Sequence, residues 1–111
     1  MKAPTKTIRV VVFQEGEWLC AQVLEYDLAV QARSLAGVYR RLRRMLEGHI
    51  AVRLAHGKQP FVDLRPAPRK YWAMFRRSRI PLPTQMFPLP VAHRKIRIPR
   101  PEVRVAGPLA A

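Results

Sequence analysis

Acidic residues, cysteines and long apolar runs are all scarce in this chain of 111 residues. Seven Asp and Glu residues face 21 Lys and Arg residues, so the formal net charge is +14. No apolar run approaches the roughly 18 to 20 residues of a membrane-spanning helix, and the first residues lack the apolar segment of a signal peptide. The single cysteine, Cys20, cannot form an internal disulfide, as is typical of a reducing compartment. We therefore expect a cytoplasmic protein that does not bind a membrane.

Catalytic and metal-binding patterns are also missing from the sequence. The three histidines and the one cysteine do not follow the spacing of a metal site. Ser34 and Ser78 have no motif around them that pairs a nucleophile with a base, and there is no glycine-rich phosphate loop. We therefore expect a protein that is not an enzyme and that uses no cofactor and no metal ion.

The positive charge is unevenly distributed along the chain. Residues 1–32 have a net charge of −1, whereas residues 33–58 combine seven basic residues with one acidic residue for a net charge of +6. Residues 59–111 carry the remaining +9. Such a charge attracts phosphate backbones or acidic protein surfaces without reading a base sequence.

The first 32 residues have the composition of three short strands. KTIRVVVFQ at 6–14 is rich in β-branched residues, and WLCAQVLEY at 18–26 alternates its side chains between two faces. The EGE between them predicts the turn of a hairpin. LAVQA at 28–32 predicts a third strand. Ser34 is then placed to cap a helix through its hydroxyl group, and Gly57 is a C-terminal stop.

The predicted helix, from residue 35 to about residue 56, separates its apolar residues from its arginines. At 100° per residue seven apolar side chains lie within an arc of roughly 140°, and they are Leu35, Val38, Tyr39, Leu42, Met45, Leu46 and Ile50. Arg40 and Arg44 lie on the opposite side of the helix, while Arg41 and Arg43 flank the apolar stripe. The helix can therefore pack on a sheet and still present arginines to a partner.

A shorter helix is predicted after the prolines at 66 and 68, because Pro68 is suited to a first helical turn. Tyr71, Trp72 and Phe75 would then share one side of it. Two interpretations stay open. The rings either form a clasp that closes the core, which we favour because one helix leaves other apolar edges of a sheet uncovered, or they form a platform on which bases stack between arginines.

The last third of the chain predicts an extended, basic, proline-rich tail. Proline recurs at nearly every third or fourth position, which predicts neither a long helix nor a central strand. HRKIRIP at 93–99 alternates basic and apolar residues and could add an edge strand to a partner or to the chain's own sheet. The expected fold is α+β, with a small antiparallel three-stranded sheet and one packed helix in residues 1–58, the clasp with its short helix in 59–79, and the tail in 80–111.

The order of elements resembles that of HicB-like antitoxin domains. The resemblance covers about residues 7–55 and lies in VVVFQEGEWLCAQVLEYDLAVQARSLAGVYRRLRRML. This stretch has an apolar strand, an acidic turn with glycine, the aromatic Trp18, a second strand, and Ser34 at the start of an amphipathic helix. The resemblance implies a fold similar to a trimmed RNase H sheet without catalytic carboxylates. It also implies a toxin–antitoxin system, in which many members cover a small RNA-binding ribonuclease toxin.

Two classes of partner stay open for such a basic domain. We favour nucleic acid, either RNA or DNA, or a nucleoprotein complex, because an RNA-binding toxin would itself be basic and would repel a chain of charge +14. The alternative is an antitoxin-like module that docks on a protein partner, and a homodimer is also possible. The residues predicted to contact phosphates are Arg40, Arg41, Arg43, Arg44, Arg76, Arg77, Arg79, Arg94, Lys95 and Arg97. Those predicted to pack on a partner are Tyr71, Trp72, Phe75, Ile96 and Ile98.

Overall fold

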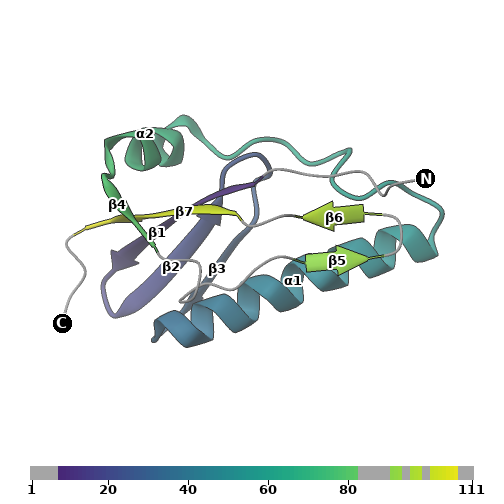
Figure 1. Cartoon of the computed structure of the whole chain (residues 1–111), viewed down its shortest axis with the longest axis horizontal. Helices are drawn as coiled ribbons and strands as arrows, with labels where there is room; N and C mark the ends of the chain where they lie inside the picture. Colours follow the sequence, from purple (N-terminus) through teal and green to yellow (C-terminus); the bar gives the residue numbers. More distant parts are fainter. Residues whose placement is uncertain (1–7, 83–90, 94–95, 99–100, 108–111) are drawn as a thin grey trace.

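The computed structural model describes residues 8–82, 91–93, 96–98 and 101–107 (Figure 1). Its elements in chain order are β1 Arg9–Glu15, β2 Trp18–Val23, β3 Ala29–Ala32, α1 Leu35–Ala55, α2 Arg69–Arg77, β4 Ile80–Pro81, β5 Val91–His93, β6 Ile96–Ile98 and β7 Glu102–Ala106. Neither described helix combines the length and the apolar character that crossing a membrane requires.

Five of the strands form one mixed sheet in the order β3-β2-β1-β7-β4. β1 and β2 are antiparallel and meet in a turn where Gly16 has a φ of 60°, and β3 is antiparallel to β2. On the other side of β1, β7 runs parallel to it, and β4 is antiparallel to β7. The α+β class is therefore confirmed, and the three antiparallel strands before α1 are present as predicted.

The prediction of a sheet with only three strands and one packed helix is wrong. β7 pairs with β1 along its whole length, from Arg9 beside Glu102 to Phe13 beside Ala106. β1 needs this neighbour because its valines at 10 to 12 are fully buried on both faces of the sheet, as is usual for an interior strand. β7 fits between the prolines at 101 and 108, in a stretch that contains none. The segment predicted to add an edge strand contains β6, which instead pairs with β5 in a separate two-stranded sheet.

α1 covers one face of the five-stranded sheet. Its cap is the predicted one, since the Ser34 hydroxyl oxygen accepts the Gly37 N–H at 3.0 Å. Val38, Leu42, Leu46 and Ile50 are buried against the valines of β1, β2 and β7, and burial of each such side chain stabilises the fold by about 2 kcal/mol. The remaining members of the predicted stripe, Leu35, Tyr39 and Met45, are partly buried in the same core.

The loop after α1 closes the end of this core. The buried Phe61 stacks on Tyr26, with ring centroids 4.5 Å apart, and lies 4.8 Å from the ring of His49. His49 Nε2 accepts the Phe61 backbone N–H at 3.0 Å, which requires a neutral imidazole. Burial and, secondarily, the charge of Arg53 lower the pKa of His49, although Asp63 acts in the opposite direction. His49 is therefore a packing residue.

α2 covers the opposite face of the sheet. Phe75 is only 4% exposed and packs with Val11, Leu24 and Ala67, while the Tyr71 ring lies 5.7 Å from that of Phe13. The two helices therefore enclose the sheet between them (Figure 1). The contacts of the α2 rings support the clasp interpretation.

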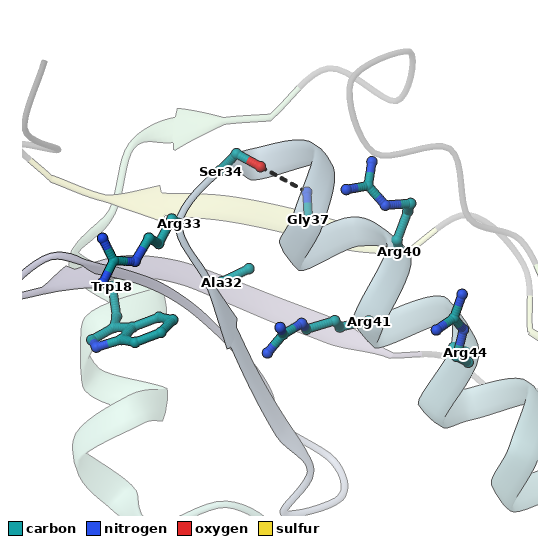
Figure 2. Close-up of a pocket in the computed structure, with 8 residues that line it drawn as sticks. All are labelled: Trp18, Ala32, Arg33, Ser34, Gly37, Arg40, Arg41 and Arg44. Carbon is teal, nitrogen blue, oxygen red and sulfur yellow. Dashed lines mark hydrogen bonds between the residues drawn. The ribbon is translucent and has the colours of Figure 1, made fainter.

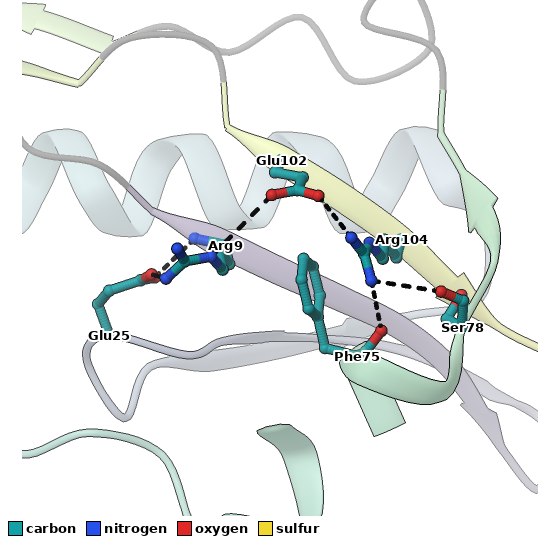
Figure 3. Close-up of polar contacts among 6 residues, drawn as sticks. All are labelled: Arg9, Glu25, Phe75, Ser78, Glu102 and Arg104. Carbon is teal, nitrogen blue, oxygen red and sulfur yellow. Dashed lines mark hydrogen bonds and ion pairs between the residues drawn. The ribbon is translucent and has the colours of Figure 1, made fainter. Parts of the chain in front are cut away.

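A polar network holds α2 and β7 against β1 (Figure 3). We call Arg9, Glu25, Glu102 and Arg104 the Glu102 network. Arg9 pairs with Glu25 at 2.7 Å and with Glu102 at 4.0 Å, and Arg104 pairs with Glu102 at 2.9 Å. The Arg104 guanidinium also lies 4.3 Å from the Phe75 ring centroid and donates to the Phe75 backbone oxygen at 3.1 Å. Arg9 and Arg104 therefore help to hold β1, β7 and α2 together.

Candidate functional site

A groove of about 420 Å³ lies where the first turns of α1 meet β3 and the start of β2 (Figure 2). We call it the arginine groove. Its lining residues are Trp18, Ala32, Arg33, Ser34, Gly37, Arg40, Arg41 and Arg44. Four of these eight residues are arginines and none is acidic, so the groove is a concentrated site of positive charge.

Gly37 allows α1 to lie close to β3 at the base of the groove. A Cβ atom at this position would come within 3.0 Å of the Ala32 Cβ atom and 3.1 Å of the Ser34 hydroxyl oxygen. The Arg40 guanidinium lies 4.0 Å from the same point, so it reaches back over the first turn of the helix. A Cβ atom at position 37 would therefore crowd the packing beneath the groove, whereas its distance to Arg40 would be an ordinary van der Waals contact.

Arg40 and Arg44 are exposed and make no hydrogen bond or ion pair with any residue that the structure describes. They are four residues apart on α1, which places them as neighbours on the helix surface. Both also line a smaller hollow of about 290 Å³ with Tyr39, Arg43 and Glu47. Their guanidinium groups are therefore available to an anionic ligand.

The other two arginines of the groove have partners in the chain. Arg41 Nη1 donates to the Gln31 backbone oxygen at 2.9 Å and so joins α1 to β3. The Arg33 guanidinium lies 5.1 Å from the Trp18 ring centroid and 3.6 Å from the Glu17 carboxylate. Because the Arg33 and Glu17 side chains are highly exposed, their ion pair holds Arg33 only weakly.

Arg43 lies on α1 but does not line the arginine groove. Its Nε donates to the Glu47 carboxylate at 2.7 Å and its Nη1 donates to the Tyr39 hydroxyl oxygen at 2.7 Å. The hydrogen bond to Glu47, followed by the one to Tyr39, raises the pKa of Arg43 above its usual value. Among the four helix arginines predicted to contact phosphates, Arg43 and Arg41 are thus engaged within the chain.

The structure does not bring the predicted basic residues of α2 to the groove. Arg76 and Arg77 are exposed at the end of α2, on the other side of the sheet, and Arg79 is exposed just after it. Arg94 and Lys95 lie outside the described residues. Arg97, Ile96 and Ile98 form β6, whose partner β5 lies beside α1.

The aromatic residues predicted to pack on a partner are instead engaged within the chain where the structure describes their side chains. Phe75 is buried, and Tyr71 and Trp72 are half-buried in the same core. The Arg9 guanidinium lies 6.0 Å from the Trp72 ring centroid. These contacts are what the clasp interpretation predicts.

Trp18 and Arg33 belong to the groove although neither was predicted as a site residue. Trp18 begins β2 and is 37% exposed. The signal that would have located them is strand register, because pairing of Leu19 with Ala32 brings Trp18 next to Arg33. Register is set jointly by the apolar patterns of both strands and by the turn between them, so it cannot be read from one strand alone.

The electrostatic environment of the groove favours anions. The first turn of α1 contains no acidic residue, so the partial positive charge of the helix N-terminus adds to that of the arginines. Within residues 8–82, 91–93, 96–98 and 101–107 no group of three His, Cys, Asp or Glu side chains could hold a metal ion. Comparison with protein-family models, with curated proteins and with solved structures finds no match to this chain. The chemistry of the groove therefore has to be inferred from its own residues.

Proposed function

We propose that this chain is a non-enzymatic protein that binds nucleic acid, alone or within a nucleoprotein complex, through phosphate contacts in the arginine groove. The observation that carries the proposal is the pair Arg40 and Arg44, which is exposed and has no partner among the described residues. A guanidinium group offers a planar fork of N–H donors that matches two phosphate oxygens. Arg33, which is weakly held, supplies a third such group.

Phosphate contacts predict a specific dependence on salt. Each phosphate that the protein neutralises contributes a slope of about −0.7 for single strands, or about −0.9 for B-DNA, to the plot of log affinity against log salt. A packed protein interface depends much less on salt because it consists largely of apolar and neutral polar contacts. The slope therefore distinguishes the two classes of partner.

The experiment compares two double variants that change the charge of the chain equally. Arg40→Glu with Arg44→Glu reverses the groove, whereas Lys58→Glu with Arg65→Glu reverses two exposed residues in the loop beyond the C-terminal end of α1. Binding to labelled RNA and DNA is measured by fluorescence anisotropy between about 50 and 200 mM salt.

We expect the groove variant to lose at least about tenfold in affinity at low salt and to lower the magnitude of the slope by about 1.4 to 1.8, for two lost phosphate contacts. The loop variant should lose little affinity beyond the loss that its lower net charge causes. Equal losses in the two variants would refute the assignment to the groove, and wild-type binding that is insensitive to salt would refute phosphate contact altogether.

A protein partner is the alternative, and one feature of the sheet favours it. β3 lies at the edge of the sheet, and no described strand pairs with its outer side. Ala29 and Gln31 of this strand are exposed, and an extended segment of a partner could pair there. This alternative includes the antitoxin-like role and the resemblance to HicB-like domains, both of which stay predictions. It would be favoured by a complex with a protein that survives high salt and nuclease treatment.

A further inference from the structure

We infer that the arginine groove takes single-stranded nucleic acid, with one unpaired base stacked at Trp18 and Arg33. The inference rests on the proposed function and specifies the form of the ligand. It is carried by an exposed aromatic ring at one end of a groove whose other end presents two arginines without a partner among the described residues. No aromatic ring would be required for phosphate contact alone.

Trp18 is the most exposed of the aromatic residues that the structure describes. Phe61 and Phe75 are buried, and Trp72 is half-buried beneath Arg9, whereas Trp18 is 37% exposed. Leu19 packs in the core beneath α1, so the neighbouring Trp18 lies on the opposite face of the sheet. It lines the groove beside Ala32 and Arg33, at the end of β3. Its ring is therefore accessible from the groove.

Arg33 already makes a cation–π contact with this ring. Its guanidinium lies 5.1 Å from the Trp18 ring centroid, and its side chain is 69% exposed. Planar guanidinium groups stack on bases as aromatic rings do. A base can therefore displace Arg33 toward a phosphate and take its place on the Trp18 ring.

The arrangement of the groove suits a strand with exposed bases. Figure 2 shows Trp18 and Arg33 at one end of the groove and Arg44 at the other, with Gly37 and Arg40 between them. A single strand that places phosphates on Arg40 and Arg44 can place a neighbouring base on Trp18. In a duplex the bases are already stacked and paired, and moving one out has a free-energy cost. Stacking at Trp18 therefore favours single strands.

The test uses the intrinsic fluorescence of Trp18. In a Trp72→Phe chain Trp18 is the only tryptophan, so quenching of its emission reports a base stacked on it. The probes are an oligo(dT) strand of about 12 nucleotides, within the usual site size of single-strand binding proteins, and a DNA hairpin whose stem is of the same length and whose strands are joined by a non-nucleotide linker, so that it has no unpaired base. Affinities for both probes are also measured by anisotropy with the Trp18→Ala and Trp18→Phe chains.

We expect oligo(dT) to quench Trp18, and the hairpin to leave its emission unchanged. Trp18→Ala should weaken oligo(dT) binding roughly 5- to 100-fold, as the loss of one stacked base predicts, and Trp18→Phe should restore most of it. Hairpin affinity should change less than about twofold, because its phosphate contacts are kept. The quenching measurement does not depend on the folding of the Trp18→Ala chain.

Two outcomes separate this inference from the proposed function. Salt-sensitive binding of both probes, with no quenching of Trp18, would overturn the stacking inference and leave phosphate binding intact. Failure of both probes to bind in a salt-sensitive way would overturn both proposals together.

Discussion

Two groups of arginines lie on opposite sides of the sheet, and they differ in what their guanidinium groups contact. In the Glu102 network, on the α2 side, both arginines have a carboxylate partner, and Arg104 also donates to backbone oxygen atoms of Phe75 and Ser78. In the arginine groove, on the α1 side, Arg40 and Arg44 have neither kind of contact with a described residue. The same residue type therefore stabilises the fold at one place and stays open to solvent at the other.

The positions of the few acidic residues account for this difference. The described ion pairs join acidic residues to Arg9, Arg33, Arg43, Arg53 and Arg104. With seven acidic residues for 21 basic ones, most basic side chains must go without such a partner. Arg40 and Arg44 are two of these and are neighbours on one helix, so they repel each other. A phosphate between them would replace this repulsion with attraction.

The largest expected effect comes from the apolar residue beneath the Glu102 network. Phe75→Ala should lower the free energy of unfolding by about 3 to 5 kcal/mol, because it leaves a cavity among Val11, Leu24 and Ala67. Urea denaturation followed by circular dichroism measures the loss. Val52→Ala, which shortens a side chain exposed on α1, is the control and should change stability by less than about 0.5 kcal/mol. A loss below about 1 kcal/mol for Phe75→Ala would contradict the clasp interpretation.

A smaller effect distinguishes the two arginine groups directly. Arg104→Met keeps an apolar stem over Phe75 but removes the hydrogen bonds and the pairing with Glu102. It should lower the free energy of unfolding by about 1 to 3 kcal/mol and leave the affinity for oligonucleotides within about twofold, apart from the change in net charge.

The same substitution in the groove should have the opposite result. Arg40→Met should leave the free energy of unfolding within about 0.5 kcal/mol of the wild-type value and lower the salt slope of binding by about 0.7 to 0.9. Urea denaturation measures the free energy of unfolding of each variant, and anisotropy measures the salt slope of its binding. If both substitutions lowered stability equally, the distinction between structural and available arginines would fail.

The elements that were predictable from sequence are those whose signals are local. The hairpin, the third strand and α1 follow from alternation, from the Ser34 cap and from an apolar spacing that runs without interruption to Ile50. β7 was not predictable in this way, because its neighbour β1 is more than 90 residues earlier in the chain and no local pattern specifies a parallel pairing. Its flanking prolines suggested an extended tail, and only the sheet explains why Val103 and Val105 are buried.

The same rule applies to the groove. Helical spacing alone put Arg40 and Arg44 opposite the buried stripe, and they are exposed in the structure. Trp18 and Arg33 come together through the register of β2 and β3, which spacing along a single element cannot provide. Sequence could not show the partner of Arg41, because Gln31 belongs to another element, whereas the four-residue spacing of Arg43 and Glu47 on one helix was a local signal for their ion pair.

The smallest expected effect concerns the exposed ion pair at the edge of the groove. Glu17→Gln removes the carboxylate 3.6 Å from Arg33, and because both side chains are highly exposed the free energy of unfolding should change by less than about 0.5 kcal/mol. Oligonucleotide affinity should nevertheless rise about twofold at low salt, since a negative charge near the phosphates is gone, and the gain should vanish at high salt. Asp27→Asn makes the same change of charge in the exposed turn between β2 and β3, beyond the far end of β2 from Trp18, and serves as the control. An equal gain in the two chains would mean that net charge, and not the local pairing of Arg33, determines binding.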